Sequence, residues 1–306
     1  MVYWLPLAIW ASWSQAGYFL TSEIFKQPVN LTLWCSRVIS LSVLLLLLAG
    51  SSNYPHDQEF YWLVIIGAFL ITLADLIKIN LCLTKSAGLL SRLSPVEVIF
   101  TFFLWTAINP ALFQYYCQNP LRIGLMVLAL LGCLGFSLRL KRCALSFSGL
   151  IQLLPAFGLM AVAIVLGKLA IQRVPVDEAI VPYMTVQSVT GLLLYSGIAV
   201  TRYLADQKNG VNSAFLSTQS LLNPSVNWRC WQAAGLMALC WLMAVPCKWI
   251  AIQQVENPSY ITMIGLSEPL WILLFYKMTG KREPGDLKSS FGILACVVVF
   301  LIATQL

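Results

Sequence analysis

The chain alternates long apolar runs with short polar connections along its whole length. Most runs hold about 20 residues with few charges, which is the length that an α-helix needs to cross a bilayer. Helices are expected because lipid offers backbone groups no hydrogen-bond partner, and the runs are too long and too uniformly apolar for barrel strands. We predict about ten helical spans, which are Val2–Leu20, Leu31–Gly50, Phe60–Leu83, Ala87–Ile108, Leu121–Leu138, Phe147–Ile171, Ala179–Leu204, Trp231–Ile252, Ser259–Tyr276 and Phe291–Leu306.

The spans divide into two halves with similar features. The most basic of the short connections, Arg139–Arg142, separates five spans from five, and Pro95 and Pro269 lie at the same depth in the fourth and ninth spans. A repeat with an odd number of spans inserts its second copy upside down, as in many secondary transporters. We therefore predict an all-α integral membrane protein built from two inverted five-helix repeats, residues 1–140 and 141–306.

Composition agrees with a membrane protein and excludes a soluble domain. Hydrophobic residues make up 59% of the chain, charged residues 10%, and the mean hydropathy is +0.80, whereas soluble domains average about 25% charged residues. The formal net charge of +7 comes mainly from alternate short loops, so it indicates membrane orientation rather than nucleic-acid binding. By the positive-inside rule these basic loops face the cytoplasm, and both chain termini lie outside.

The residues needed for most catalytic and metal sites are missing from the spans. The nine cysteines are scattered without a C-x-x-C pair, and the single histidine, His56, lies in a polar loop. The sequence contains no G-x-S-x-G, no H-E-x-x-H and no phosphate-binding G-x-x-x-x-G-K-[ST] loop. We expect neither an enzyme nor a metal or cofactor site, and proton coupling through a neutral Glu97 or Glu268 stays an open alternative.

The fourth span carries a carboxylate well inside its apolar run. A charge at that depth costs roughly 2.5–3.5 kcal/mol on insertion scales, which makes Glu97 a functional candidate. Ser94, Thr101 and Trp105 follow helical spacing with Glu97 and share its face, while Pro95 can act as a hinge. The alternative is a protonated Glu97 that makes a purely structural hydrogen bond.

Further charges lie inside the second and third spans. Asp75 and Lys78 are three residues apart, so they can form a self-neutralising ion pair, or one of them can handle a solute. Arg37 lies about two turns into the second span, where it either snorkels to the interface or joins the same site. Lys168, near the end of the sixth span, is expected to snorkel.

The second half supplies its own charges beside prolines. Lys248 lies deep in the eighth span, two residues after Pro246, and Glu268 directly precedes Pro269 in the ninth span. These two charges can bind solute, or they can pair with each other across the bundle. The full candidate set for solute binding is Trp13, Arg37, Asp75, Lys78, Glu97, Thr101, Trp105, Tyr183, Gln187, Trp241, Lys248, Glu268 and Trp271, with hinges at Pro95, Pro246 and Pro269.

Several short motifs resemble those of a known family. They are Trp10–Trp13 in the first span, Leu93–Val96 in the fourth, Leu266–Leu270 in the ninth and Gly280–Pro284 after it. With the layout of five and five spans, the chain resembles the drug/metabolite transporter superfamily in its ten-helix EamA-like form. It departs from that family in lacking a Gly-Glu box after the fourth span, and the family's cytoplasmic termini differ from the orientation that the loop charges predict.

The resemblance implies a secondary transporter of a bacterial inner membrane, with a central cavity between the halves and alternating access. Its partners are then a small-molecule solute and membrane lipids. The deep charges number three positive and three negative, and aromatic residues accompany them. A balanced, aromatic-rich site favours a zwitterion, either amino-acid-like or adenosyl-bearing. A flippase for a lipid-linked substrate and a non-transporting membrane scaffold remain the alternatives.

Overall fold

The computed structural model describes residues 3–50, 54–84, 87, 90, 93–139, 147–208, 224–280 and 287–305. Within these residues the regular structure is helical, and none of them lies in a strand. The helices are α1 (Trp4–Phe25), α2 (Val29–Ala49), α3 (Gln58–Thr84), α5 (Pro95–Ile108), α6 (Pro110–Cys117), α7 (Pro120–Arg139), α8 (Phe147–Ile171), α9 (Val176–Lys208), α11 (Pro224–Gln254), α12 (Ser259–Gly265), α13 (Glu268–Met278) and α14 (Leu287–Gln305). Residues 140–142 of the basic central linker and 281–284 of the Gly280–Pro284 motif lie outside the described residues.

Most predicted spans correspond to one continuous helix, and the exceptions are the fourth and the ninth. In the fourth, α5 begins at Pro95, which occupies its first turn rather than kinking a longer helix. The ninth is broken between α12 and α13, and Pro269 lies in the first turn of α13. A proline is tolerated at that position because the first-turn N–H groups have no partner within the helix.

A short helix, α6, follows α5 where the sequence indicated only a loop. The Asn109 side chain accepts a hydrogen bond from the Leu112 amide at 3.2 Å, and Pro110 occupies the first turn. An asparagine cap followed by proline is a strong helix start. The axes of α5 and α6 differ by 106°, so the chain turns sharply at Asn109.

Among the described residues, six helical segments are long and apolar enough to cross a membrane. They are Val29–Ala49, Gln58–Leu83, Leu153–Ile171, Val176–Thr201, Trp228–Gln254 and Ser259–Met278, and the bent α5–α6 pair adds a seventh if it forms one span. Pro120–Phe136 and Ser289–Thr304 are apolar but shorter. The described part of the chain is therefore that of a multi-pass membrane protein.

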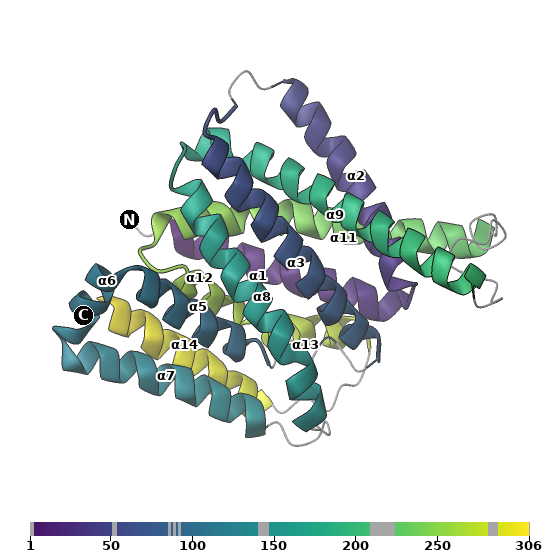
Figure 1. Ribbon diagram of the computed structural model, residues 1–306. Coiled ribbons are helices and arrows are strands. Elements are labelled where there is room, and N and C mark those ends of the chain that lie inside the picture. Colours follow the sequence, from purple (N-terminus) through teal and green to yellow (C-terminus); the bar gives the residue numbers. More distant parts are fainter. Residues whose placement is uncertain are drawn as a thin grey trace.

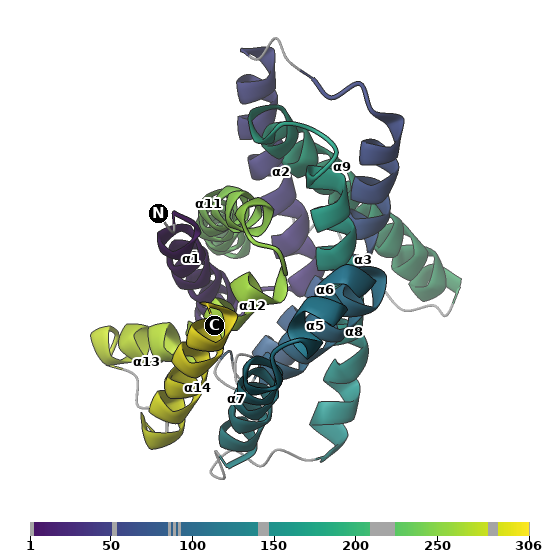
Figure 2. The ribbon, with the colours of Figure 1, turned by 90° about the vertical axis from the view of Figure 1, so that its left-hand side faces the viewer.

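Helices from the two parts of the chain pack against each other in pairs. Helix α1 lies along α11, α3 along α8, α2 along α9, and α7 along α14. Figure 1 shows α7 and α14 side by side, and Figure 2 shows α1 next to α11. Each of these pairs joins a helix before the central linker to one after it.

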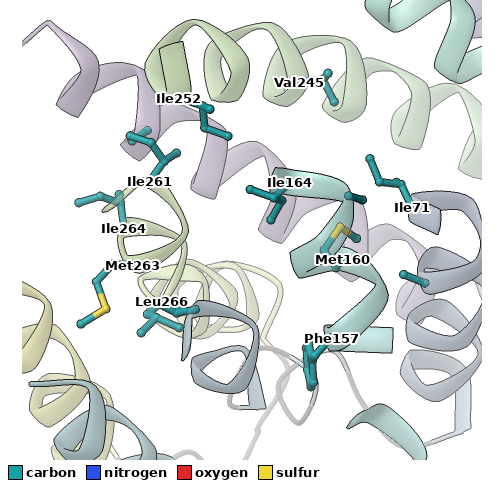
Figure 3. Close-up of a cluster of buried hydrophobic side chains, with 14 of the residues drawn as sticks. Ile71, Phe157, Met160, Ile164, Val245, Ile252, Ile261, Met263, Ile264 and Leu266 are labelled. Atoms are coloured by element: carbon teal, nitrogen blue, oxygen red, sulfur yellow. The ribbon is translucent and has the colours of Figure 1, made fainter. Parts of the chain in front are cut away.

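The centre of the bundle is filled by apolar side chains from α3, α8, α11 and α12. Figure 3 shows Phe157 and Ile164 of α8 together with Val245 of α11 and Ile261 of α12 in this region. Phe157 is fully buried and Ile164 nearly so. This cluster surrounds the polar cavity described below.

Gly167 of α8 leaves room for the Trp249 side chain of α11. A Cβ atom built on Gly167 would lie only 2.1 Å from the Trp249 ring. Trp249 is 3% exposed and also packs on Tyr183, with ring centroids 4.7 Å apart. The α8–α11 contact therefore depends on the missing side chain at position 167.

Candidate functional site

A cavity of about 80 Å³ lies inside the helix bundle. Residues from α1, α3, α5, α8, α11, α12 and α13 line it, so both parts of the chain contribute to its wall. Four charged side chains face this space: Lys78, Glu97, Lys248 and Glu268. All four belong to the candidate set predicted from the sequence, and the fold brings them together from four different helices.

Lys78 of α3 and Glu97 of α5 neutralise each other. The Lys78 Nζ atom lies 2.6 Å from Glu97 Oε2, and the two side chains are 7% and 13% exposed. The same ammonium group lies 5.1 Å from the centroid of the Phe157 ring. A short charge-assisted contact of this kind is strong when it is shielded from water.

A second ion pair lies next to the cavity but does not line it. The Arg37 Nη2 atom is 3.5 Å from Asp75 Oδ2, and Arg37 stacks over the Trp241 ring at 4.3 Å. Arg37 is only 2% exposed, so it does not snorkel to the interface. The alternative in which Asp75 and Lys78 form an ion pair with each other is not realised, because each residue pairs with a charge on another helix.

Lys248 and Glu268 line the cavity without a paired charge. Neither side chain forms a hydrogen bond or an ion pair with any other described residue. The alternative in which they pair with each other across the bundle is therefore not realised. Glu268 is the first residue of α13, where the helix dipole favours a negative charge.

The serine before Glu268 anchors the break between α12 and α13. Ser267 Oγ lies 2.9 Å from Ser12 Oγ of α1 and accepts a hydrogen bond from Trp271 Nε1 at 3.1 Å. Trp271 therefore supports the wall from behind and is not one of the cavity residues. Trp13 likewise packs outside the cavity, with its ring 5.9 Å from that of Phe275.

The remaining predicted residues also lie in the packing around the cavity. The Thr101 hydroxyl donates to the Glu97 backbone carbonyl at 2.8 Å, and Trp105 is 3% exposed. Tyr183 and Gln187 of α9 are both buried away from the cavity. The aromatic part of the lining consists of Phe19 and Phe157 rather than the predicted tryptophans.

The predicted hinges have different positions. Pro95 and Pro269 lie in the first turns of α5 and α13, close to Glu97 and Glu268, whereas Pro246 lies inside α11 two residues from Lys248. Each proline is thus close in sequence to a charged cavity residue.

Helix α1 lines the cavity with residues other than the predicted Trp13. Ser12 and Gln15 supply polar atoms to the cavity, and Ala8 and Phe19 complete their face of the helix. The spacing of these four residues follows the helical period, so a search for a polar stripe in the first span would have found them. Thr262 of α12 was also missed.

Lys168 was expected to snorkel, and the structure contradicts this. It is 1% exposed, and its Nζ atom donates to the carbonyl of Ile252 at 2.7 Å and also to that of Val255. These carbonyls belong to the last turn of α11 and the residue just beyond it, where a cation complements the helix dipole. Lys168 therefore fastens the end of α11 to α8.

Two polar clusters lie near opposite ends of the bundle. Near α6, the Tyr116 and Tyr260 hydroxyls are 2.7 Å apart, and Asn257 donates to Tyr116 at 3.4 Å. We call these three residues the tyrosine cluster. At the other end, Glu23 of α1 accepts from the Ala87 amide at 2.9 Å and from the Tyr276 hydroxyl, and we call this the Glu23 cluster. In Figure 1, α6 lies toward the end of the bundle that holds both termini, and α13 lies away from that end.

Comparisons with known proteins identify a similar fold and no family. No protein-family model matches the chain, and no curated protein matches it. One solved structure, described only as "Crystal structure of protein", has a TM-score of 0.51 and 12% sequence identity. The match covers 98% of this chain and 96% of that chain, so the likeness extends over the whole helical fold.

Proposed function

We propose that this protein is a secondary-active transporter that moves a small polar, zwitterionic metabolite across the membrane by alternating access. The observation that carries the proposal is the cavity inside the bundle, where Lys78, Glu97, Lys248 and Glu268 face one another. Charges inside a membrane protein are costly, and they commonly mark a solute or ion pathway. A scaffold would gain nothing from them.

The packing of the helices supports two matching halves. By order along the chain, α1 corresponds to α8, α2 to α9, α3 to α11 and α7 to α14. When each helix is replaced by its counterpart, the contact of α1 with α11 becomes the contact of α8 with α3. The contacts of α2 with α9 and of α7 with α14 map onto themselves. Such a relation is expected for repeats that enclose a binding site at their interface.

Breaks in the helices support the same proposal. The first turns of α5 and α13 lie beside the cavity, and each contains a proline and a glutamate that faces the cavity. Discontinuous helices near the membrane midplane form the solute sites of many secondary transporters.

The tyrosine cluster and the Glu23 cluster suit the role of gates that close the cavity toward one side of the membrane or the other. The tyrosine cluster joins α6 to α12 and the segment before it, and the Glu23 cluster joins α1 to α13. In alternating access each would open in turn while the other stays closed.

With the motifs described above, we place the protein in the ten-helix EamA-like group of the drug/metabolite transporters, in a bacterial inner membrane.

Transport by the purified protein in proteoliposomes tests the proposal. We expect uptake or counterflow of at least one radiolabelled solute from a panel of amino acids, nucleosides, polyamines, sugar phosphates and adenosyl metabolites. Glu97→Gln should abolish that transport, because the variant leaves Lys78 without its partner and removes a cavity charge. Glu256→Gln, at an exposed position, is the matched control and should transport like the wild type.

The same assay separates the alternatives. Movement of a lipid-linked substrate, with none of the small solutes carried, would favour a flippase. A folded protein that moves neither class of substrate would contradict the proposal and favour a scaffold.

A further inference from the structure

We propose that Lys248 and Glu268 are the two poles of the solute site: Lys248 binds the carboxylate of the solute and Glu268 binds its ammonium group. We further infer that the solute is a compact amino-acid zwitterion rather than an adenosyl-bearing metabolite. This inference rests on the proposed function and names the solute class for the same cavity.

The four charged side chains of the cavity are not equally available to a solute. Lys78 and Glu97 lie 2.6 Å apart, so this pair has no net charge to offer a solute. Lys248 and Glu268 face the same space, and neither pairs with another described residue. Among the described residues, the cavity therefore presents one positive group and one negative group that form no ion pair.

The free energy of those two groups also matters. A charge removed from bulk water is unfavourable unless an opposite charge or a hydrogen bond replaces the lost hydration. A solute with a single charge would compensate one of the two poles and leave the other unpaired. A zwitterion satisfies both poles at once, so it is the solute class that gains most from this arrangement.

The size of the cavity limits the solute as well. The cavity volume of about 80 Å³ holds roughly five to eight water-sized groups, since each needs about 10–15 Å³. An amino acid with a short side chain has about that number of non-hydrogen atoms, and an adenosyl group alone has more. The small and apolar residues Ala8, Ala11 and Val245 belong to the same wall and suit a short aliphatic side chain.

Binding of four probes to the detergent-solubilised protein tests this assignment. The probes are L-alanine, propionate, which lacks the amino group, ethylamine, which lacks the carboxylate, and S-adenosylmethionine. We expect L-alanine to bind the wild type at least about 30-fold more tightly than propionate or ethylamine, because each lost charge contact leaves a buried partner unpaired. S-adenosylmethionine should not compete.

Two variants then assign the poles. In Lys248→Met, the advantage of L-alanine over ethylamine should disappear, while its advantage over propionate persists. In Glu268→Gln the reverse should hold. Lys277→Met, an exposed lysine on α13, is the control and should keep both advantages. Both cavity variants remove a charge that forms no ion pair with another described residue, so we expect them to fold, and their melting temperatures check this directly.

Several results would overturn the inference. The assignment of the poles would be refuted if either variant reduced the advantage of L-alanine over propionate and over ethylamine equally. It would also be refuted if Lys248→Met removed the advantage over propionate, or if Glu268→Gln removed the advantage over ethylamine. Competition by S-adenosylmethionine, or a wild type that binds none of the four probes, would refute the compact zwitterion. If the protein still transports another solute, the transporter proposal survives while this inference fails.

Discussion

The same substitution should destabilise the protein at one of the two cavity lysines and change its stability little at the other. Lys78→Met leaves Glu97 without its partner, and removal of one member of a buried ion pair costs about 3–5 kcal/mol. The Glu97 side chain is 13% exposed and borders the cavity, so water offsets part of this loss and we expect about 3 kcal/mol. Lys248→Met breaks no ion pair among the described residues, and its stability should stay within about 1 kcal/mol of wild type.

Thermal unfolding of the purified protein, followed by tryptophan fluorescence, measures this contrast. Because 1 kcal/mol corresponds to about 2–4 °C in a chain of about this size, Lys78→Met should melt roughly 6 °C or more below wild type. The double variant Lys78→Met/Glu97→Gln should recover much of the loss, because the stranded charge is gone. If Lys248→Met loses as much stability as Lys78→Met, or if the double variant shows no recovery, the distinction between the two lysines is wrong.

Three further predictions concern positions outside the cavity. Gly167→Ala should destabilise the protein by about 1–3 kcal/mol in a denaturation experiment, because the new Cβ would meet the Trp249 ring at 2.1 Å. Lys168→Met should lower the free energy of unfolding by about 1.5–3 kcal/mol, because two backbone carbonyls lose a charged donor. It should also speed hydrogen exchange at the end of α11, and unchanged exchange there would argue against the role of Lys168 in holding that end. The hydrogen bond from Arg173 holds the pKa of Asp57 below its ordinary value of 3.8. The contribution of ionised Asp57 to the stability of the folded protein is therefore complete above pH 3.8, and it is lost as the pH falls through the lowered pKa. The difference in melting temperature between wild type and Asp57→Asn should accordingly shrink at low pH, and a difference that grows there would contradict it.

The sequence predicted the positions of most helices, because each apolar run is evident in the hydropathy of the chain. Six of the described segments are long and apolar enough to cross a membrane, against the ten spans that we predicted. The sequence also singled out the four charged cavity residues, since a charge in an apolar run is conspicuous wherever its partner lies. The partners themselves were not predictable. Asp75 and Lys78 are close in sequence, but the packing of α3 against other helices brings Arg37 and Glu97 nearer.

The orientation of the tryptophans and the contacts of Lys168 depend on how the helices pack, which the sequence alone does not show. The tryptophans looked like cavity walls because they lie deep in their spans, but depth does not determine which way a ring faces in a bundle. Lys168 looked like a snorkelling residue because it is near a span end, whereas the end of α11 lies within reach and offers it carbonyl acceptors. The polar stripe of α1 was visible in the sequence but carried no charge to draw attention to it.

The most direct test of the central claim is the accessibility of the cavity from each side of the membrane. A single cysteine at Thr262, which lines the cavity, is introduced after the nine native cysteines are replaced. A membrane-impermeant maleimide is then applied from either side of sealed vesicles. We predict that the cysteine is labelled from both sides and that a transported solute slows the labelling. Labelling from neither side, or labelling at a rate that no transported solute changes, would contradict alternating access through this cavity.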